Sequence, residues 1–200
     1  MDLRRGVGMK YEGQEYYEIT VAGLRRRLNV VKITDSLWIA GFVLWGDVEL
    51  TNTAARQLTD RLRRFEFDYL VSLEAKALPL VHMIATYLSD PDRGRYFPYV
   101  VCRKSAKGYM RDPLTVEVKS ITTSSVQSLV LDGVEADRLR GRRVAVVDDV
   151  VSTGGSLRAV EELLARVNAQ IVARATVLLE EGGYQNPELI SLGTLPIFTR

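Results

Sequence analysis

The chain has 200 residues, of which 46% are hydrophobic and 26% charged, and its formal net charge is +2. This length suits one domain with a full hydrophobic core, and the small net charge argues against a nucleic-acid or membrane-surface binder. One cysteine excludes an internal disulfide framework, no apolar run reaches the roughly 18 residues that span a bilayer, and the first ten residues show no apolar signal segment. We therefore expect a cytoplasmic, single-domain protein without a membrane partner.

The first 45 residues carry two segments of β-type composition, 16–21 and 28–33. Between them, 22–27 is expected to be a turn or loop, and its three consecutive arginines are expected to be solvated. Residues 1–45 break the strand–helix alternation of the remaining chain, so we expect a tail and a small flap beside the core. Aromatic side chains are expected to pack this flap onto the core: Trp38, Phe42 and Trp45.

From Asp47 onward, strands and helices alternate. Apolar residues at three-to-four spacing predict helices after Asp47, over 78–88 and over 156–167. Short apolar runs predict the strands, at 69–73, 99–102, 143–147 and 171–179, with 189–198 as an edge strand. Strands that are apolar on both faces are typical of an α/β fold with a parallel sheet. We expect residues 46–200 to form an α/β core domain whose twisted, mostly parallel sheet is flanked by helices.

The most informative stretch runs from Arg143 to Leu157. A buried strand ends in Asp148 and Asp149, and a turn of small residues then opens a helix: Ser152, Thr153, Gly154, Gly155 and Ser156. The first N–H groups of a helix lack partners and favour an anion, while adjacent carboxylates can hold a vicinal diol and help position a hydrated Mg²⁺. The stretch therefore predicts a site for a ribose 5-phosphate. Neither GxxxxGK[ST] nor GxGxxG occurs in the chain.

The run from Val146 to Ser156 resembles the phosphoribosyl-pyrophosphate signature of type I phosphoribosyltransferases. The resemblance implies the α/β fold of that family with an N-terminal hood. It also implies that Asp148 and Asp149 contact the ribose hydroxyls and that residues 152–156 wrap the 5-phosphate. Relatives of this kind use Mg²⁺ and commonly pair into homodimers, so we expect both of this chain.

Two further segments resemble parts of adenine-type family members. Residues 74–77 (Glu74, Ala75, Lys76 and Ala77) resemble the pyrophosphate loop, with Lys76 and Ala77 where the family has arginine and glycine. Lysine can still meet a diphosphate as a point charge. Arg103, Lys104 and Lys107 open a polar stretch, 103–120, that resembles the mobile catalytic loop and is expected to supply cations to the pyrophosphate. Within it, Glu117 resembles a family glutamate near the purine ring nitrogens.

The resemblance implies a pentosyl transferase of purine salvage that joins phosphoribosyl pyrophosphate to a nucleobase, with adenine expected first. The residues expected to be catalytic are Asp148, Asp149, Lys104 and Glu117. Xanthine, hypoxanthine and pyrimidine acceptors stay open, because Lys76 and Ala77 depart from the adenine-type loop. The alternative is a phosphoribosyl-pyrophosphate-sensing regulator on the same fold. We rank it lower because no helix-turn-helix fits in the first 45 residues, and a nucleic-acid partner is therefore not expected.

Overall fold

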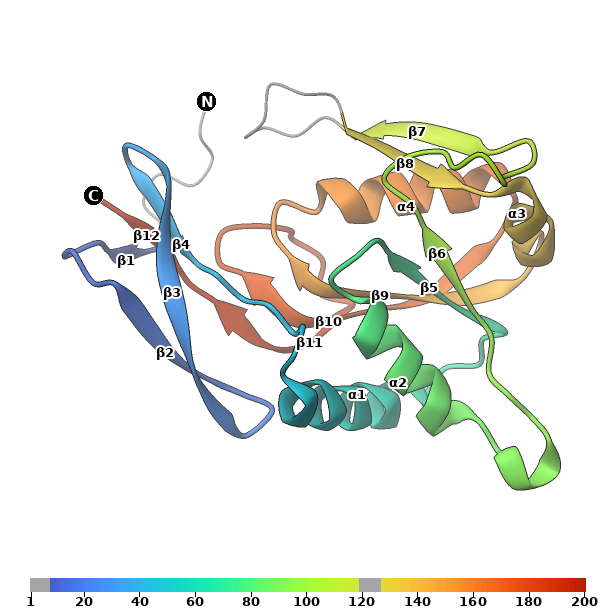
Figure 1. Ribbon diagram of the computed structural model, residues 1–200, viewed down its shortest axis with the longest axis horizontal. Helices are drawn as coiled ribbons and strands as arrows, with labels where there is room; N and C mark the ends of the chain where they lie inside the picture. Colours follow the sequence, from blue (N-terminus) through green and yellow to red (C-terminus); the bar gives the residue numbers. More distant parts are fainter. Residues whose placement is uncertain (1–7, 119–126) are drawn as a thin grey trace.

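The computed structural model describes residues 8–118 and 127–200. Its centre is a parallel sheet of five strands in the order β11-β10-β9-β5-β6. These strands are β5 (Tyr69–Leu73), β6 (Tyr99–Cys102), β9 (Arg143–Val151), β10 (Gln170–Glu180) and β11 (Leu189–Leu195). Helices α1 (Val48–Leu62) and α2 (Leu78–Leu88) cover one face, and α4 (Gly155–Arg166) covers the other (Figure 1). The predicted α/β fold with a parallel sheet is confirmed.

The two faces of the sheet bury separate apolar clusters. Ala145 and Val147 of β9 belong to the cluster under α1 and α2, whereas Val144 and Val146 belong to the cluster under α4. Successive side chains of a strand point to opposite faces, so a strand covered on both sides must be apolar throughout. This explains the unbroken apolar run at the start of β9, which leads directly to the paired acids.

Local signals set where the helices begin. Asp47 precedes α1, and its carboxylate accepts a hydrogen bond from the N–H of Leu50 at 3.0 Å. Pro79 lies in the first turn of α2, where its missing N–H removes no intrahelical bond. Both helices were predicted, and both are present. No helix in the described residues is long and apolar enough to cross a membrane.

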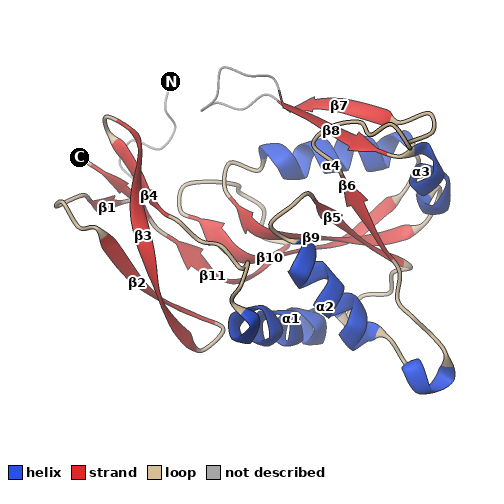
Figure 2. Cartoon of the chain, in the orientation of Figure 1, coloured by secondary structure: helices blue, strands red, loops and turns tan. Residues whose placement is uncertain are grey.

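A second five-stranded sheet stands beside the core (Figure 2). Its order is β1-β12-β4-β3-β2, from β1 (Met9–Lys10), β2 (Tyr16–Val21), β3 (Leu24–Thr34), β4 (Leu37–Ala40) and β12 (Ile197–Thr199). The C-terminal strand β12 pairs parallel with β1 and antiparallel with β4. The expected flap therefore also contains residues from the end of the chain, and the stretch 189–198 is two strands rather than one. β11 is an edge strand, as expected, whereas β12 lies inside the flap sheet.

The three arginines expected in a turn lie in β3, so that prediction was wrong. The turn is confined to Ala22 and Gly23, with φ of 53° and 85°, and residues 24–29 pair with β2. Arg26 forms ion pairs with the carboxylates of Asp47 and, at 2.9 Å, Glu49. This arginine therefore ties the flap to the start of α1. Trp38 and Phe42 are buried as predicted, whereas Trp45 is 56% exposed and does not pack the flap onto the core.

The stretch 103–120 is not one continuous loop. Within it, β7 (Leu114–Val118) pairs antiparallel with β8 (Gln127–Leu131), and this hairpin lies over α4 (Figure 1). Val116 and Leu129 belong to the apolar cluster under α4. The apolar alternation of residues 114, 116 and 118 is a strand pattern, and it outweighs the polar composition of the surrounding residues. Residues 119 and 120 lie outside the described residues. The remaining elements are η1 (Pro91–Arg93) and α3 (Gly133–Leu139).

Candidate functional site

A cavity of about 200 Å³ lies at the carboxyl ends of β5 and β9. Its lining comes from four separate segments of the chain: Leu73, Glu74, Ala75, Lys76, Lys104, Ser128, Leu129, Asp148, Asp149, Val150 and Ser156. Ligands of open α/β sheets bind outside the carboxyl ends of the strands. The cavity is therefore where such a fold would hold a ligand, and seven of the predicted site residues line it.

The two acids at the end of β9 form the floor of this site. The backbone N–H of Asp149 donates to Oδ1 of Asp148 at 2.9 Å, and Asp149 is only 6% exposed. Burial of the carboxyl, and then the charge of Asp149, raise the pKa of Asp148. Oδ2 of Asp149 is buried and has no hydrogen-bond partner within the described part of the chain. A buried carboxylate oxygen without a donor is an acceptor suited to a ligand hydroxyl or a hydrated cation.

The turn after β9 leads into α4 through a glycine that no other residue could replace without strain. Gly154 has φ of 80°, and a Cβ atom there would lie 2.2 Å from Cδ2 of Tyr184. The N–H of Tyr184 donates to the carbonyl of Ser152 at 2.8 Å, so the loop after β10 supports this turn. The N-cap residue of α4 is Gly154, which has no side chain to cap the helix. The first N–H groups of this helix, including that of Ser156, are therefore available to an anion.

The segment after β5 contributes both signs of charge. The carboxylate of Glu74 accepts from the backbone N–H of Lys104 at 3.0 Å and pairs with Nε of Arg103 at 3.2 Å. These two contacts, the amide first, hold the pKa of Glu74 below its usual range. Nη1 of Arg103 also donates to the hydroxyl of Tyr109 at 2.7 Å. Arg103 is thus engaged by protein groups, whereas Lys76 and Lys104 line the cavity. The Glu74–Ala75 peptide is cis.

Several predicted site residues lie outside the cavity lining. Glu117 is exposed on β7, Nζ of Lys107 donates to Ser105 at 2.8 Å, and Ala77 is buried at the start of α2. Arg103 does not line the cavity, but it pairs with Glu74, which does. The other four belong to the turn that precedes Ser156: Ser152, Thr153, Gly154 and Gly155.

Four lining residues were missed by the sequence reasoning: Leu73, Ser128, Leu129 and Val150. Leu73 and Val150 directly adjoin predicted residues, so the motifs themselves could have indicated them. Ser128 lies on β8, and its hydroxyl donates to the carbonyl of Lys104 at 3.2 Å. No local pattern could have indicated Ser128 or Leu129, because the β7–β8 hairpin brings them to the site.

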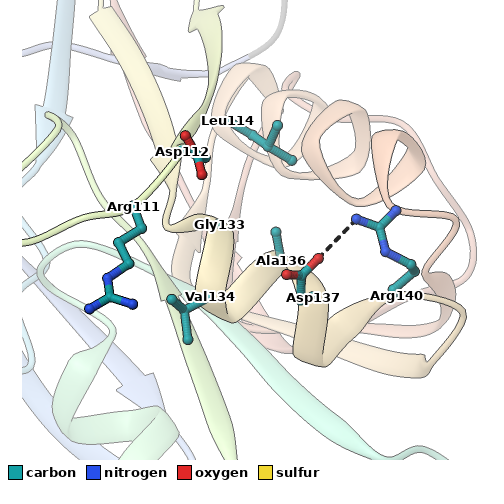
Figure 3. Close-up of a pocket in the computed structure, with 8 residues that line it drawn as sticks. All are labelled: Arg111, Asp112, Leu114, Gly133, Val134, Ala136, Asp137 and Arg140. Atoms are coloured by element: carbon teal, nitrogen blue, oxygen red, sulfur yellow. Dashed lines mark hydrogen bonds and ion pairs between the residues drawn. The ribbon is translucent and has the colours of Figure 1, made fainter.

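A larger crevice of about 460 Å³ lies between the β6–β7 connection and α3 (Figure 3). Two of its charged side chains, Asp137 and Arg140, pair with one another at 3.0 Å, and Arg111 extends away from that pair. None of the predicted site residues lines this crevice. The smaller cavity between β5 and β9 is therefore the candidate functional site.

The family model "Phosphoribosyl transferase domain" matches residues 49–191. The chain belongs to this family. The match confirms the resemblance to type I phosphoribosyltransferases, whose members are transferases of the pentosyl type. It begins inside α1, so the strands of the flap sheet, β1 to β4 and β12, lie outside the matched segment.

Two relatives by sequence carry purine transferase names. The chain is 33% identical over 123 residues to a hypoxanthine/guanine phosphoribosyltransferase of Methanothrix soehngenii. The aligned segment covers 62% of this chain and 57% of that protein. It is 46% identical over 81 residues to HGPRTase-like protein 3 of Haloterrigena turkmenica, covering 40% of each. The chain thus spans about half the length of the curated relatives it matches.

Solved phosphoribosyltransferase structures share the fold. Adenine phosphoribosyltransferase from Thermoanaerobacter pseudethanolicus superposes with a TM-score of 0.62 at 22% identity, covering 90% of this chain and 95% of that one. The enzyme from Rhodothermus marinus gives a TM-score of 0.62 at 20% identity, covering 91% and 95%. At this identity the likeness establishes the fold alone.

Proposed function

We propose that the chain transfers the 5-phosphoribosyl group from phosphoribosyl pyrophosphate to a purine base, in cytoplasmic purine salvage. One observation carries the proposal. Paired acids, the N-terminus of α4 and two lysines, which come from three distant parts of the chain, line a single cavity. These are the groups needed for a ribose diol, a 5-phosphate and a pyrophosphate, respectively.

In the proposed reaction, a ring nitrogen of the base bonds to C1 of the ribose while the bond from C1 to the pyrophosphate oxygen breaks, and the ring N–H proton that the base loses passes to the solvent. The transition state has oxocarbenium character, as in glycosyl transfer generally. Negative charge grows on the departing pyrophosphate, where Lys76 and Lys104 stabilise it. Asp148 and Asp149 accept hydrogen bonds from the ribose hydroxyls and hold the sugar against the loop. Glu74 acts indirectly, because it fixes the backbone of Lys104.

Magnesium is the proposed cofactor. The unpartnered Oδ2 of Asp149, beside Asp148, suits a hydrated cation near the ribose hydroxyls. Among residues 8–118 and 127–200, no group of three or more His, Cys, Asp and Glu side chains could hold a metal alone. Substrate oxygens and water would therefore complete the coordination. When bound, Mg²⁺ offsets the charge of the departing pyrophosphate.

The acceptor is a purine in this proposal. Adenine is the first candidate because residues 74–77 resemble the pyrophosphate loop of adenine-type family members. Hypoxanthine and guanine are the alternatives favoured by the names of the sequence relatives. Release of pyrophosphate with adenine, hypoxanthine, guanine, xanthine and uracil in turn distinguishes them. Turnover with uracil alone would refute the purine assignment.

The site assignment is tested with Asp149→Asn. We expect this variant to keep the far-ultraviolet circular dichroism of the wild type and to lose most of its turnover, because the carboxylate is replaced by an amide of nearly the same shape. A gel shift at physiological salt tests the alternative regulator. Specific nucleic-acid binding by a chain that transfers phosphoribose to none of the bases would overturn the enzyme proposal.

A homodimer is proposed on the face formed by the β4–α1 connection and α2. Trp45 is 56% exposed and Val48 70%, and beside them lies a groove of about 230 Å³ lined mainly by apolar atoms, with Leu44, Pro79 and Met83 among its residues. A projecting indole and an apolar groove on one surface are self-complementary under a two-fold axis. Exposed apolar surface of this kind favours association.

A further inference from the structure

Two buried hydroxyls, from the strands on either side of β9, donate hydrogen bonds to β9 beside Asp148. In the described part of the chain, six polar or charged residues are buried: Thr51, Thr59, Ser72, Asp149, Thr176 and Glu180. Three of these, Ser72, Asp149 and Thr176, gather at the carboxyl end of β9. Burying a polar group is unfavourable unless it forms a hydrogen bond, so this concentration requires a reason.

Ser72 approaches from β5. Its side chain is fully buried, and its hydroxyl donates to the carbonyl of Val147 at 2.9 Å. The β5–β9 ladder ends at this point, with Ser72 opposite Val147, and β5 then leads into the segment around Glu74. The serine hydroxyl therefore bonds to β9 at the last pair of this ladder, immediately before Asp148.

Thr176 approaches from β10, on the other side. It is also fully buried, and its hydroxyl donates to the carbonyl of Asp149 at 3.0 Å, with the carbonyl of Leu178 as a second acceptor at 3.2 Å. The Cα register passes from Thr176 opposite Asp148 to Leu178 opposite Val150. A side-chain hydroxyl thus reaches the carbonyl of Asp149, which lies between two residues of β9 that are paired with β10 in one unbroken register.

The carboxylates of Asp148 and Asp149 repel one another, so the part of β9 that carries them needs to be held in place. Asp148 and Asp149 are adjacent, and neighbouring carboxylates in a low-dielectric site repel. The hydroxyls of Ser72 and Thr176 donate to the backbone carbonyls of the residues before and after Asp148, and these hydrogen bonds resist displacement of the strand. Apolar side chains would fill the same space but could not hold the carbonyls. The sequence pattern agrees, because Ser72 stands among apolar neighbours in β5 and Thr176 among apolar neighbours in β10.

We propose that Ser72 and Thr176 are positioning residues that fix the Asp148–Asp149 pair against the ribose hydroxyls of the ligand. The inference rests on the proposed function, because it assigns these acids to the ribose. Neither Ser72 nor Thr176 lines the cavity. Each acts through a carbonyl of β9, so removing it moves the acids without removing them.

The test compares matched variants that each delete one buried hydroxyl. Thr176→Val and Ser72→Ala remove the proposed contacts. Thr59→Val is the control, since Thr59 is 1% exposed and donates to the carbonyl of Ala55 at 2.7 Å within α1, away from the cavity. Thr176→Ser restores the hydroxyl and provides the rescue. The probe is ribose 5-phosphate, and its Kd is measured by calorimetry, which needs no turnover.

We expect Thr176→Val and Ser72→Ala each to weaken ribose 5-phosphate about fivefold to tenfold, which corresponds to the loss of one buried hydrogen bond. Thr176→Ser should bind within about twofold of the wild type, as should Thr59→Val. In turnover, kcat/KM for phosphoribosyl pyrophosphate should fall with Thr176→Val while the KM for the base stays unchanged. A merely structural role would lower stability equally in Thr176→Val and Thr59→Val and leave these kinetic constants alike.

Equal Kd values for Thr176→Val and Thr59→Val, with both variants folded, would overturn the inference. A Thr176→Ser variant that binds as weakly as Thr176→Val would do the same. The proposed reaction fails separately, if the wild type binds ribose 5-phosphate but transfers phosphoribose to no base. In that case the comparison of Kd values still decides the positioning role. A wild type that binds neither ribose 5-phosphate nor phosphoribosyl pyrophosphate would refute both.

Discussion

Replacing Gly154 by alanine should destabilise the protein more than the same change at a glycine with similar backbone but open surroundings. Gly154 has φ of 80°, and Gly141 has φ of 68°, where an added Cβ would meet no atom of the described residues within 4 Å. A left-handed conformation costs a non-glycine residue about 1–2 kcal/mol. At Gly154 the added Cβ would also lie 2.2 Å from Cδ2 of Tyr184, well inside an ordinary carbon contact of about 3.5–4.0 Å.

The ring of Tyr184 must therefore move by more than about 1 Å, and overpacking of this kind typically adds about 1–3 kcal/mol. We expect Gly154→Ala to lower the free energy of unfolding by about 2–5 kcal/mol and Gly141→Ala by about 1–2 kcal/mol. Urea denaturation measures both. In a Tyr184→Ala background the contact with the ring disappears, and of the three nearest atoms only Nη1 of Arg158 at 2.9 Å remains, the flexible end of a long side chain. Gly154→Ala should then lower the free energy of unfolding only slightly more than Gly141→Ala does.

The same variants separate stability from binding. Tyr184 donates its N–H to the carbonyl of Ser152, so displacing Tyr184 should disturb the turn that precedes α4. Gly154→Ala should weaken phosphoribosyl pyrophosphate by at least about tenfold, as expected when a ligand-binding turn shifts by an ångström, whereas Gly141→Ala should bind normally. Equal losses of unfolding free energy at the two glycines, with Tyr184 present, would refute the steric reasoning.

Three other substitutions have expected outcomes. Asp148→Asn should raise the Tm at pH 7. Folding raises the pKa of the Asp148 carboxyl, so the wild type loses stability as the pH rises above the ordinary pKa of an aspartate, and asparagine removes that loss. The gain should vanish in melts near pH 3, where the carboxyl is protonated in both states. Glu74→Gln should lower the Tm at pH 7, and the loss should shrink as the pH falls below about 4.5, since the contacts with Lys104 and Arg103 lower the pKa of Glu74. Trp45→Glu should convert the proposed dimer to a monomer in light scattering, and a dimer that persists would place the interface elsewhere.

Much of the fold was predictable because its signals are local. The helices after Asp47 and over 78–88 follow from three-to-four apolar spacing, a capping carboxylate and a proline in the first turn. The apolar run into Asp148 and the glycine-rich turn that follows are likewise contiguous. For the same reason, the acids and Ser156 were identified from the sequence and lie together on the cavity.

The errors came from contacts between distant segments. The arginines at 25–27 look like a solvated turn until β2 pairs with them and Arg26 meets Asp47, 21 residues away. Polar composition suggested one loop over 103–120, although an alternating apolar pattern at 114–118 indicated the strand β7. The roles of Lys107 and Glu117 remain predictions, and neither residue lines the cavity.

The sequence by itself determined the paired acids, the glycine-containing turn after them and the alternation of strands and helices, because each depends on neighbours along the chain. Only the tertiary structure decided that β12 completes the flap sheet, that Ser128 reaches the site, and that Ser72 and Thr176 bond to β9 from both sides. These features depend on which strands lie next to one another. Sheet pairing joins residues far apart in sequence, and no local pattern records it.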